Sequence, residues 1–154
     1  MGLDMYLSAK RYMSKYFDAE DTARIEKVNE IFGVEGIEDG DYNAQEVTFR
    51  VAYWRKANAI HKWFVDKCQD GVDECQETWL SREQLQELVD TCTAVLLNKE
   101  KAGELLPSAN GFFFGGTDYD EWYFRDLEYT VERIQKILKD PAFEKCDFYY
   151  QSSW

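Results

Sequence analysis

The sequence predicts a single α+β domain over residues 1–154, in which about four helices pack on a small, mainly antiparallel sheet. Three observations support this prediction. The length of 154 residues suits one domain. Hydrophobic residues make up 45% of the chain and charged residues 31%, enough for a core and a hydrated surface. Segments with a two-residue apolar period alternate with segments of helical period, in the order strand, helix, strand, helix, short strand, two helices and strand.

The first third of the chain predicts two strands around one helix. Residues 3–9 and 46–54 alternate apolar and more polar side chains, and we expect Phe49 in the second strand to be buried. A helix is expected over about 19–32, since apolar residues recur there at helical intervals and Gly33 is placed to end it. The residues that define its apolar face are Ala19, Ala23, Ile25, Val28, Ile31 and Phe32.

The middle of the chain predicts two helices with a short extended piece between them. The first helix starts near Arg55 and stops at Gly71, because apolar side chains recur there at helical intervals. Residues 75–79 are the candidate extended piece. The second helix starts at Ser81, which forms a capping box with Gln84, and it runs to about residue 98.

The last third predicts the longest helix and a terminal strand. The helix follows a glycine-containing loop over 99–118 and ends before Pro141. Residues 146–154 are the candidate strand. We expect Thr117 or Asp118 to cap this helix, with Asp120 or Glu121 completing a capping box.

Charge and hydropathy exclude several functional classes. With 18 basic and 30 acidic residues the net charge is −12, which disfavours sequence-independent binding of duplex nucleic acid, since that binding depends on Lys and Arg. Every apolar run is shorter than the roughly 18 to 20 residues that a membrane span needs. The first six residues lack the basic segment of a signal peptide and the myristoylation pattern. We therefore expect a cytoplasmic protein without a membrane partner.

The cysteines and the single histidine do not predict a metal centre, and no motif predicts a cofactor. Cys68, Cys75, Cys92 and Cys146 contain no CxxC pair, and His61 is the only histidine. A structural zinc site needs two close pairs of ligands. We expect reduced thiols, mostly buried as small hydrophobic side chains.

Positive charge is concentrated in the middle third of the chain. Residues 51–102 carry 7 basic and 9 acidic residues, a net charge of −2, whereas the two outer thirds each carry −5. Arg55, Asn58 and Lys62 follow one another at i, i+3 and i+7, so they share one face of the predicted helix. The helix N-terminus and the Arg55 guanidinium together could bind a phosphate or a carboxylate. The alternative is a hydrated basic face with no ligand.

The same predicted helix carries His61 and several aromatic residues. His61 lies close to its apolar edge and is either a general acid or base, or a hydrogen-bonded histidine of the core. Trp54, Trp63 and Phe64 could form a wall on which a ring-shaped ligand stacks, although such residues more often belong to the core.

The glycine-flanked run Phe112-Phe113-Phe114 is too apolar for an exposed loop, so it must pack against the protein. The acids that follow it either complement the dipole of the next helix or serve as cation ligands or partners of Arg55. Acids from different parts of the chain could also act as a carboxylate pair in hydrolysis, if the fold brought them together. The complete set of candidate ligand-binding residues is Trp54, Arg55, Asn58, His61, Lys62, Phe113, Tyr119, Asp120 and Tyr123.

Three blocks of the sequence resemble a family of small bacteriophage-encoded proteins. They are the opening MGLDMYL, the segment WRKANAIHKWF over 54–64, and the stretch that runs from Leu106-Pro107 through GFFFGG to Tyr119-Asp120-Glu121. The resemblance covers most of the chain. It implies a phage origin and the cytoplasm of a bacterial host, and it implies no particular activity.

Two classes of function follow from these observations. The favoured one is a phage accessory protein that binds and antagonises a host or defence factor. It would do so through an acidic surface, with clusters at 35–46 and 118–132 that include Glu35, Glu38, Asp39 and Asp41, or through a pocket for a small anionic, ring-containing ligand. The alternative is a small enzyme that acts on a nucleotide-like substrate, with His61 as acid or base and Arg55 as the anion clamp.

Overall fold

The computed structural model describes residues 2–35, 43–111 and 114–154. Its contacts divide the chain into two compact units, which we describe separately. The main unit comprises residues 1–9 and 50–154, and the small unit comprises residues 10–49. Three residues of the predicted acidic loop, Glu38, Asp39 and Asp41, lie outside the described ranges, as does Phe113 of the candidate site.

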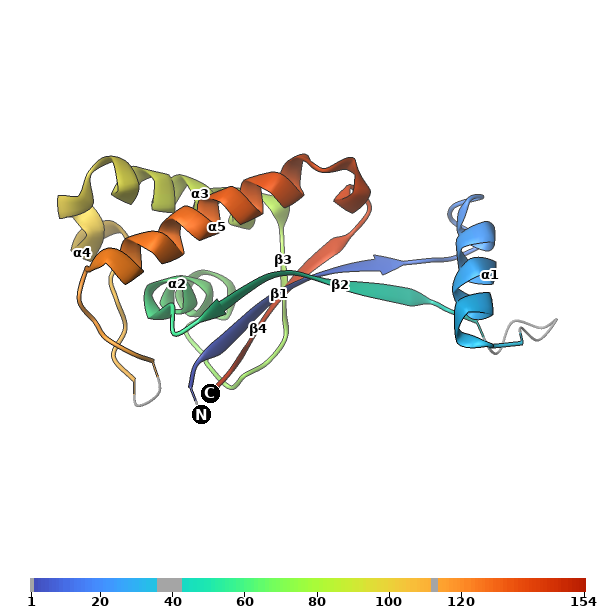
Figure 1. The fold of residues 1–154 in the computed structure, drawn as a ribbon, viewed down its shortest axis with the longest axis horizontal. Helices are drawn as coiled ribbons and strands as arrows, with labels where there is room; N and C mark the ends of the chain where they lie inside the picture. Colours follow the sequence, from blue (N-terminus) through green and yellow to red (C-terminus); the bar gives the residue numbers. More distant parts are fainter. Residues whose placement is uncertain (1, 36–42, 112–113) are drawn as a thin grey trace. The chain divides into compact units, whose positions relative to one another are not determined.

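The predicted α+β class with an antiparallel sheet is confirmed (Figure 1). The four strands of the sheet lie in the order β2-β1-β4-β3. β3 and β4 pair antiparallel, with Trp79 facing Tyr149. Their bounds are β1 (Asp4–Tyr12), β2 (Glu46–Arg55), β3 (Thr78–Leu80) and β4 (Asp147–Ser153).

The core of the main unit lies between one face of its strands and its helices. Alternate residues of β1 are fully buried, among them Met5 and Leu7, and β4 contributes Phe148 and Tyr150 to the same core. On the other face of the sheet Tyr53 and Trp79 stay exposed, so the sheet is covered on one side. The helices of this unit are α2 (Asn58–Cys68), α3 (Arg82–Leu97), the short α4 (Ala102–Leu105) and α5 (Glu121–Lys139).

Residues at the ends of two predicted helices predicted correctly where these helices begin or end. The capping box of α3 forms as expected: the Ser81 hydroxyl accepts from the backbone N–H of Gln84, whose side chain accepts from the backbone N–H of Ser81. Gly33 ends the first helix in the left-handed conformation, with φ of 64°. These predictions succeeded because each depends only on residues within a few positions along the chain.

Two predictions about the last third were wrong in detail. The cap of α5 is Asp120, whose carboxylate accepts from the backbone N–H of Tyr123, so the helix begins later than a cap at Thr117 or Asp118 would place it. Asp120 has the extended backbone that an N-cap requires. In addition, the expected loop over 99–118 contains a 3₁₀ turn (Lys99–Lys101) and α4.

The small unit contains α1 (Asp21–Phe32) and the adjoining parts of β1 and β2. The residues that α1 buries are polar, namely Asp21 and Asn29. Ile31 and Phe32, which belong to the predicted apolar face, are 71% and 77% exposed. The expectation that Phe49 is buried was also wrong, since 46% of this side chain is exposed. Periodicity revealed the apolar face but not whether anything in the chain covers it.

Among the described residues, no helix combines the length and the apolar character needed to cross a bilayer.

We expect Phe148→Ala to lower the free energy of unfolding by about 3 to 5 kcal/mol, because Phe148 is 1% exposed and its removal leaves a cavity in the core. The matched control is Phe49→Ala, which should cost less than about 1 kcal/mol because its ring is half in solvent. Urea unfolding followed by circular dichroism measures both losses. Equal losses for the two variants would contradict this assignment of the core.

Candidate functional site

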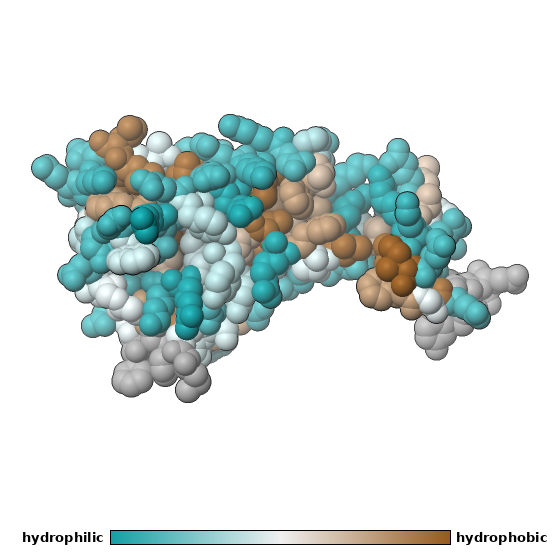
Figure 2. Space-filling model, viewed as in Figure 1, coloured by the Kyte–Doolittle hydropathy of each residue, from teal (hydrophilic) through white to brown (hydrophobic). Residues whose placement is uncertain are grey.

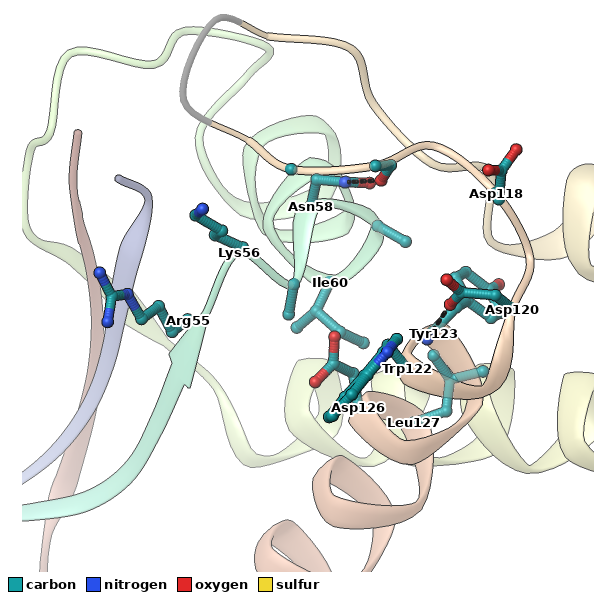
Figure 3. Close-up of a pocket in the computed structure, with 14 residues that line it drawn as sticks. Arg55, Lys56, Asn58, Ile60, Asp118, Asp120, Trp122, Tyr123, Asp126 and Leu127 are labelled. Carbon is teal, nitrogen blue, oxygen red and sulfur yellow. Dashed lines mark hydrogen bonds between the residues drawn. The ribbon is translucent and has the colours of Figure 1, made fainter. Parts of the chain in front are cut away.

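A cavity of about 300 Å³ lies in the main unit between the β2–α2 junction and the start of α5 (Figure 3). Its walls come from two segments of the sequence. Residues 55–60 form one side, and residues of the 115–127 segment form the other. These are the basic helix start and the glycine-rich block that sequence analysis selected separately. The structure therefore brings the two selected segments together around one pocket.

Asn58 holds the loop that forms one wall of this pocket. Its side chain is 5% exposed, and its amide nitrogen donates to the carbonyls of Phe114 (3.1 Å) and Gly116 (2.7 Å). Its side-chain oxygen accepts from the backbone N–H of Ala109 (3.0 Å). All three bonds go to the backbone of the loop, so Asn58 has a structural role in this wall of the pocket.

A glycine lets this loop approach the β2–α2 junction closely. Gly115 has φ of +87°, a conformation that other residues rarely adopt. A Cβ atom at this position would lie 3.3 Å from the Cβ atom of Lys56. Lys56 itself has a positive φ of 60°. The chain thus turns tightly on both sides of the contact, which brings the loop against the start of α2.

Charges of opposite sign lie on opposite sides of the pocket, as Figure 3 shows. Arg55 and Lys56 lie on the strand side, where the first residues of α2 are uncharged and the Ala57 side chain at the N-cap cannot accept a hydrogen bond. The backbone amides of this helix start therefore keep their partial positive charge. The carboxylates lie on the α5 side and belong to Asp118, Asp120 and Asp126.

Asp126 is a pocket residue that sequence analysis missed. Burial, and to a smaller extent the negative charge of Asp120, raises the pKa of its carboxyl group to about 6. One signal was present in the sequence, because Asp126 follows Tyr123 by three positions and directly precedes Leu127, two residues of a buried apolar stripe along the helix. An acid beside such a stripe is placed where its charge is poorly hydrated.

The aromatic wall of the pocket also differs from the predicted one. Trp54 is 2% exposed and its indole N–H donates to Thr130 (2.9 Å), so it belongs to the core. Trp122, which was not predicted, lines the pocket and is 70% exposed. Tyr123 also lines it, with its hydroxyl donating to the Leu106 carbonyl (2.7 Å). Tyr119 packs edge-on against Tyr123 and lines a neighbouring depression instead.

His61 is a core residue with both ring nitrogens engaged. It is 1% exposed, with Nδ1 2.7 Å from the Tyr150 hydroxyl and Nε2 2.9 Å from the Asp73 carboxylate. Neither nitrogen is left to exchange a proton with a ligand, which supports the core interpretation of this histidine. It borders a shallow depression apart from the main pocket, as does Lys62, which pairs with Asp66.

The described residues contain no group of three or more His, Cys, Asp and Glu side chains that could hold a metal ion. Two of the thiols are also poor nucleophiles. Burial raises the pKa of Cys68 to about 11 and that of Cys92 to about 12, so both stay protonated at neutral pH. The side chains that line the pocket supply carboxylates, cations and aromatic rings.

We expect His61→Ala to lower the free energy of unfolding by about 2 to 4 kcal/mol, because it leaves the buried Tyr150 hydroxyl and one side of Asp73 without a partner. Lys62→Ala on the same helix is the control and should change stability by less than about 0.5 kcal/mol. Thermal unfolding of the two variants makes the comparison. A His61→Ala variant as stable as the Lys62→Ala control would contradict the structural role of His61 and leave it as a candidate catalytic group.

The raised pKa of Asp126 predicts a pH-dependent effect of Asp126→Asn. A carboxyl whose pKa is higher in the folded than in the unfolded protein favours folding below about pH 4, and this contribution is lost as the pH rises through about 6. Asp126→Asn should therefore stabilise the protein by about 1 kcal/mol at pH 7.5, after allowance for partial exposure, and by little at pH 4. Glu128→Gln, an exposed acid of the same helix, should show no such difference between the two pH values.

Comparisons of this chain with protein-family models, with curated proteins and with solved structures gave no match. The functional assignment of the pocket therefore depends on its own geometry and charges.

Proposed function

We propose that this chain is a binding protein whose pocket takes up a small ring-containing ligand with an anionic group. The observation that carries the proposal is the cavity itself, whose lining combines basic residues at the β2–α2 junction with carboxylates and an exposed tryptophan on the α5 side. Concave sites with an aromatic surface and a few convergent polar groups are typical of small-molecule binding.

The two sides of the pocket would bind different parts of the ligand. An anionic group fits the strand side, where Arg55, Lys56 and the amides of the α2 N-terminus supply positive charge. A ring can stack on the exposed indole of Trp122. Amino or hydroxyl groups on the ring can donate to the carboxylates of Asp120 and Asp126. Nucleotides are one class of compound that combines these three features.

The biological role that we propose follows the resemblance to small bacteriophage proteins. The chain would act in the cytoplasm of a bacterial host as an accessory protein that antagonises a host or defence factor by binding it. If the acidic surface takes part in binding, the net charge of −12 favours a partner with exposed positive charge.

An enzyme acting on a nucleotide-like substrate is the second candidate, and one observation favours it. Asp126 can exchange a proton near neutral pH, whereas Asp120 caps α5 with its carboxylate. A pocket carboxyl group with a raised pKa could serve as a general acid or base. In this candidate Asp126 takes the role that the sequence analysis gave to His61.

Isothermal titration with the four common nucleoside monophosphates and their nucleosides tests the ligand proposal. We expect at least one monophosphate to bind, its nucleoside to bind at least about tenfold more weakly, and Arg55→Ala and Trp122→Ala each to weaken binding about tenfold or more. Lys67→Ala and Trp79→Ala are matched controls, since these residues lie outside the pocket.

Equal affinities for nucleosides and monophosphates, or an equal loss in the control variants, would contradict the proposed mode of binding. Turnover of a bound monophosphate that Asp126→Asn abolishes would favour the enzyme instead.

A further inference from the structure

The small unit exposes large apolar side chains to an unusual extent. Figure 2 shows hydrophobic surface on this unit, which contains only residues 10–49. Exposed apolar groups of this kind are common singly, but a group of them on one small unit indicates an interaction surface. Those that are at least two thirds exposed are Tyr16 (83%), Phe17 (86%), Ile31 (71%) and Phe32 (77%).

The attachment of α1 explains why its apolar residues stay exposed. Asp21 anchors the start of the helix, accepting from the backbone N–H of Ser14 and from the Arg11 guanidinium, both at 3.0 Å. Asn29 anchors its last turn through the backbone N–H of Ala44 and the side chain of Asn43. Polar contacts thus position the helix, and its apolar side chains are not needed for this purpose.

Three apolar residues on the second half of α1 share one side of the helix, where Ile31 and Phe32 are exposed and Val28 is half-buried. Val28, Ile31 and Phe32 are three and four positions apart, so their side chains are neighbours. We call this group the α1 apolar face. Apolar groups at this spacing are what a second helix packs against when an amphipathic segment binds to a protein surface.

The charge of the small unit selects the kind of partner. The described residues of this unit, 10–35 and 43–49, include 5 basic and 7 acidic side chains, a net charge of −2. Arg11 and Arg24 are held in ion pairs with Asp18 and Asp21. Within the described parts of the chain, no ion pair neutralises Glu26 or Glu30 of α1. A second copy of this unit would bring like charges together, whereas a basic partner would be attracted.

We propose that the α1 apolar face is a docking site for a basic amphipathic helix of a partner protein. Apolar residues of that helix would cover Val28, Ile31 and Phe32, and its Lys and Arg side chains would face the acids of the small unit. This site is separate from the ligand pocket, and it goes beyond the proposed function because it names the chemistry of a protein partner.

Three synthetic peptides of about 18 residues serve as probes for this proposal. The first is an amphipathic helix of Lys and Leu, the second has the same pattern with Glu in place of Lys, and the third has the composition of the first with its order scrambled. Fluorescence anisotropy with the full chain measures their affinities. We expect the Lys/Leu helix to bind at least about tenfold more tightly than either other peptide, and less tightly at high salt.

The matching variant is the double substitution Ile31→Ser and Phe32→Ser, which should weaken binding of the Lys/Leu helix about tenfold or more. These side chains are exposed, so the fold should persist, as circular dichroism can verify. Leu97→Ser, which removes an 84% exposed apolar side chain from the main unit, is the control and should leave the affinity within about twofold.

Three outcomes would overturn the proposal. If the scrambled peptide bound as tightly as the Lys/Leu helix, charge alone would account for the binding. Equal effects of the double variant and of Leu97→Ser would remove the α1 apolar face as the site. A dimer of the wild-type chain that the double substitution dissociates would make a second copy the occupant. None of these outcomes affects the ligand pocket, which Arg55→Ala tests independently.

Discussion

The pocket depends on the side chain of Asn58, which makes three hydrogen bonds to the backbone of a loop more than fifty residues away in the sequence. A loop of this kind has few regular backbone partners, and a buried amide that offers both donors and an acceptor can replace them. Because Asn58 is the first residue of α2, it connects the loop directly to the helix whose N-terminus forms the basic side of the pocket. Pocket shape and charge are thus linked through one residue.

The main unit supports this arrangement with a core in which several polar side chains are paired. The indole of Trp54 donates to Thr130 on α5, and the ring of Phe64 stacks on Tyr150 with 4.0 Å between centroids. Tyr150 in turn contacts His61, so that the histidine helps to attach β4 to α2. Fully paired polar groups in a core are rigid, which keeps the pocket walls in position.

The two units differ in what holds them together. The main unit has a large apolar core, whereas α1 of the small unit is fixed by the buried polar residues Asp21 and Asn29. Hydrogen bonds and ion pairs can position a helix without covering its apolar side chains. In the small unit this leaves apolar surface and negative charge together, a combination that suits binding of another protein more than independent stability.

Local patterns in the sequence determined the strands, the main helices, the capping box at Ser81 and the end of α1 at Gly33, because each depends on neighbours along the chain. They also selected the two segments that line the pocket. Only the tertiary structure decided the roles of single residues, since these depend on contacts between distant positions. His61 is enclosed by Asp73 and Tyr150, Asp126 shares a pocket with Asp120, and the apolar face of α1 remains uncovered. Periodicity shows which side of a helix is apolar, but burial depends on what the rest of the chain places against it.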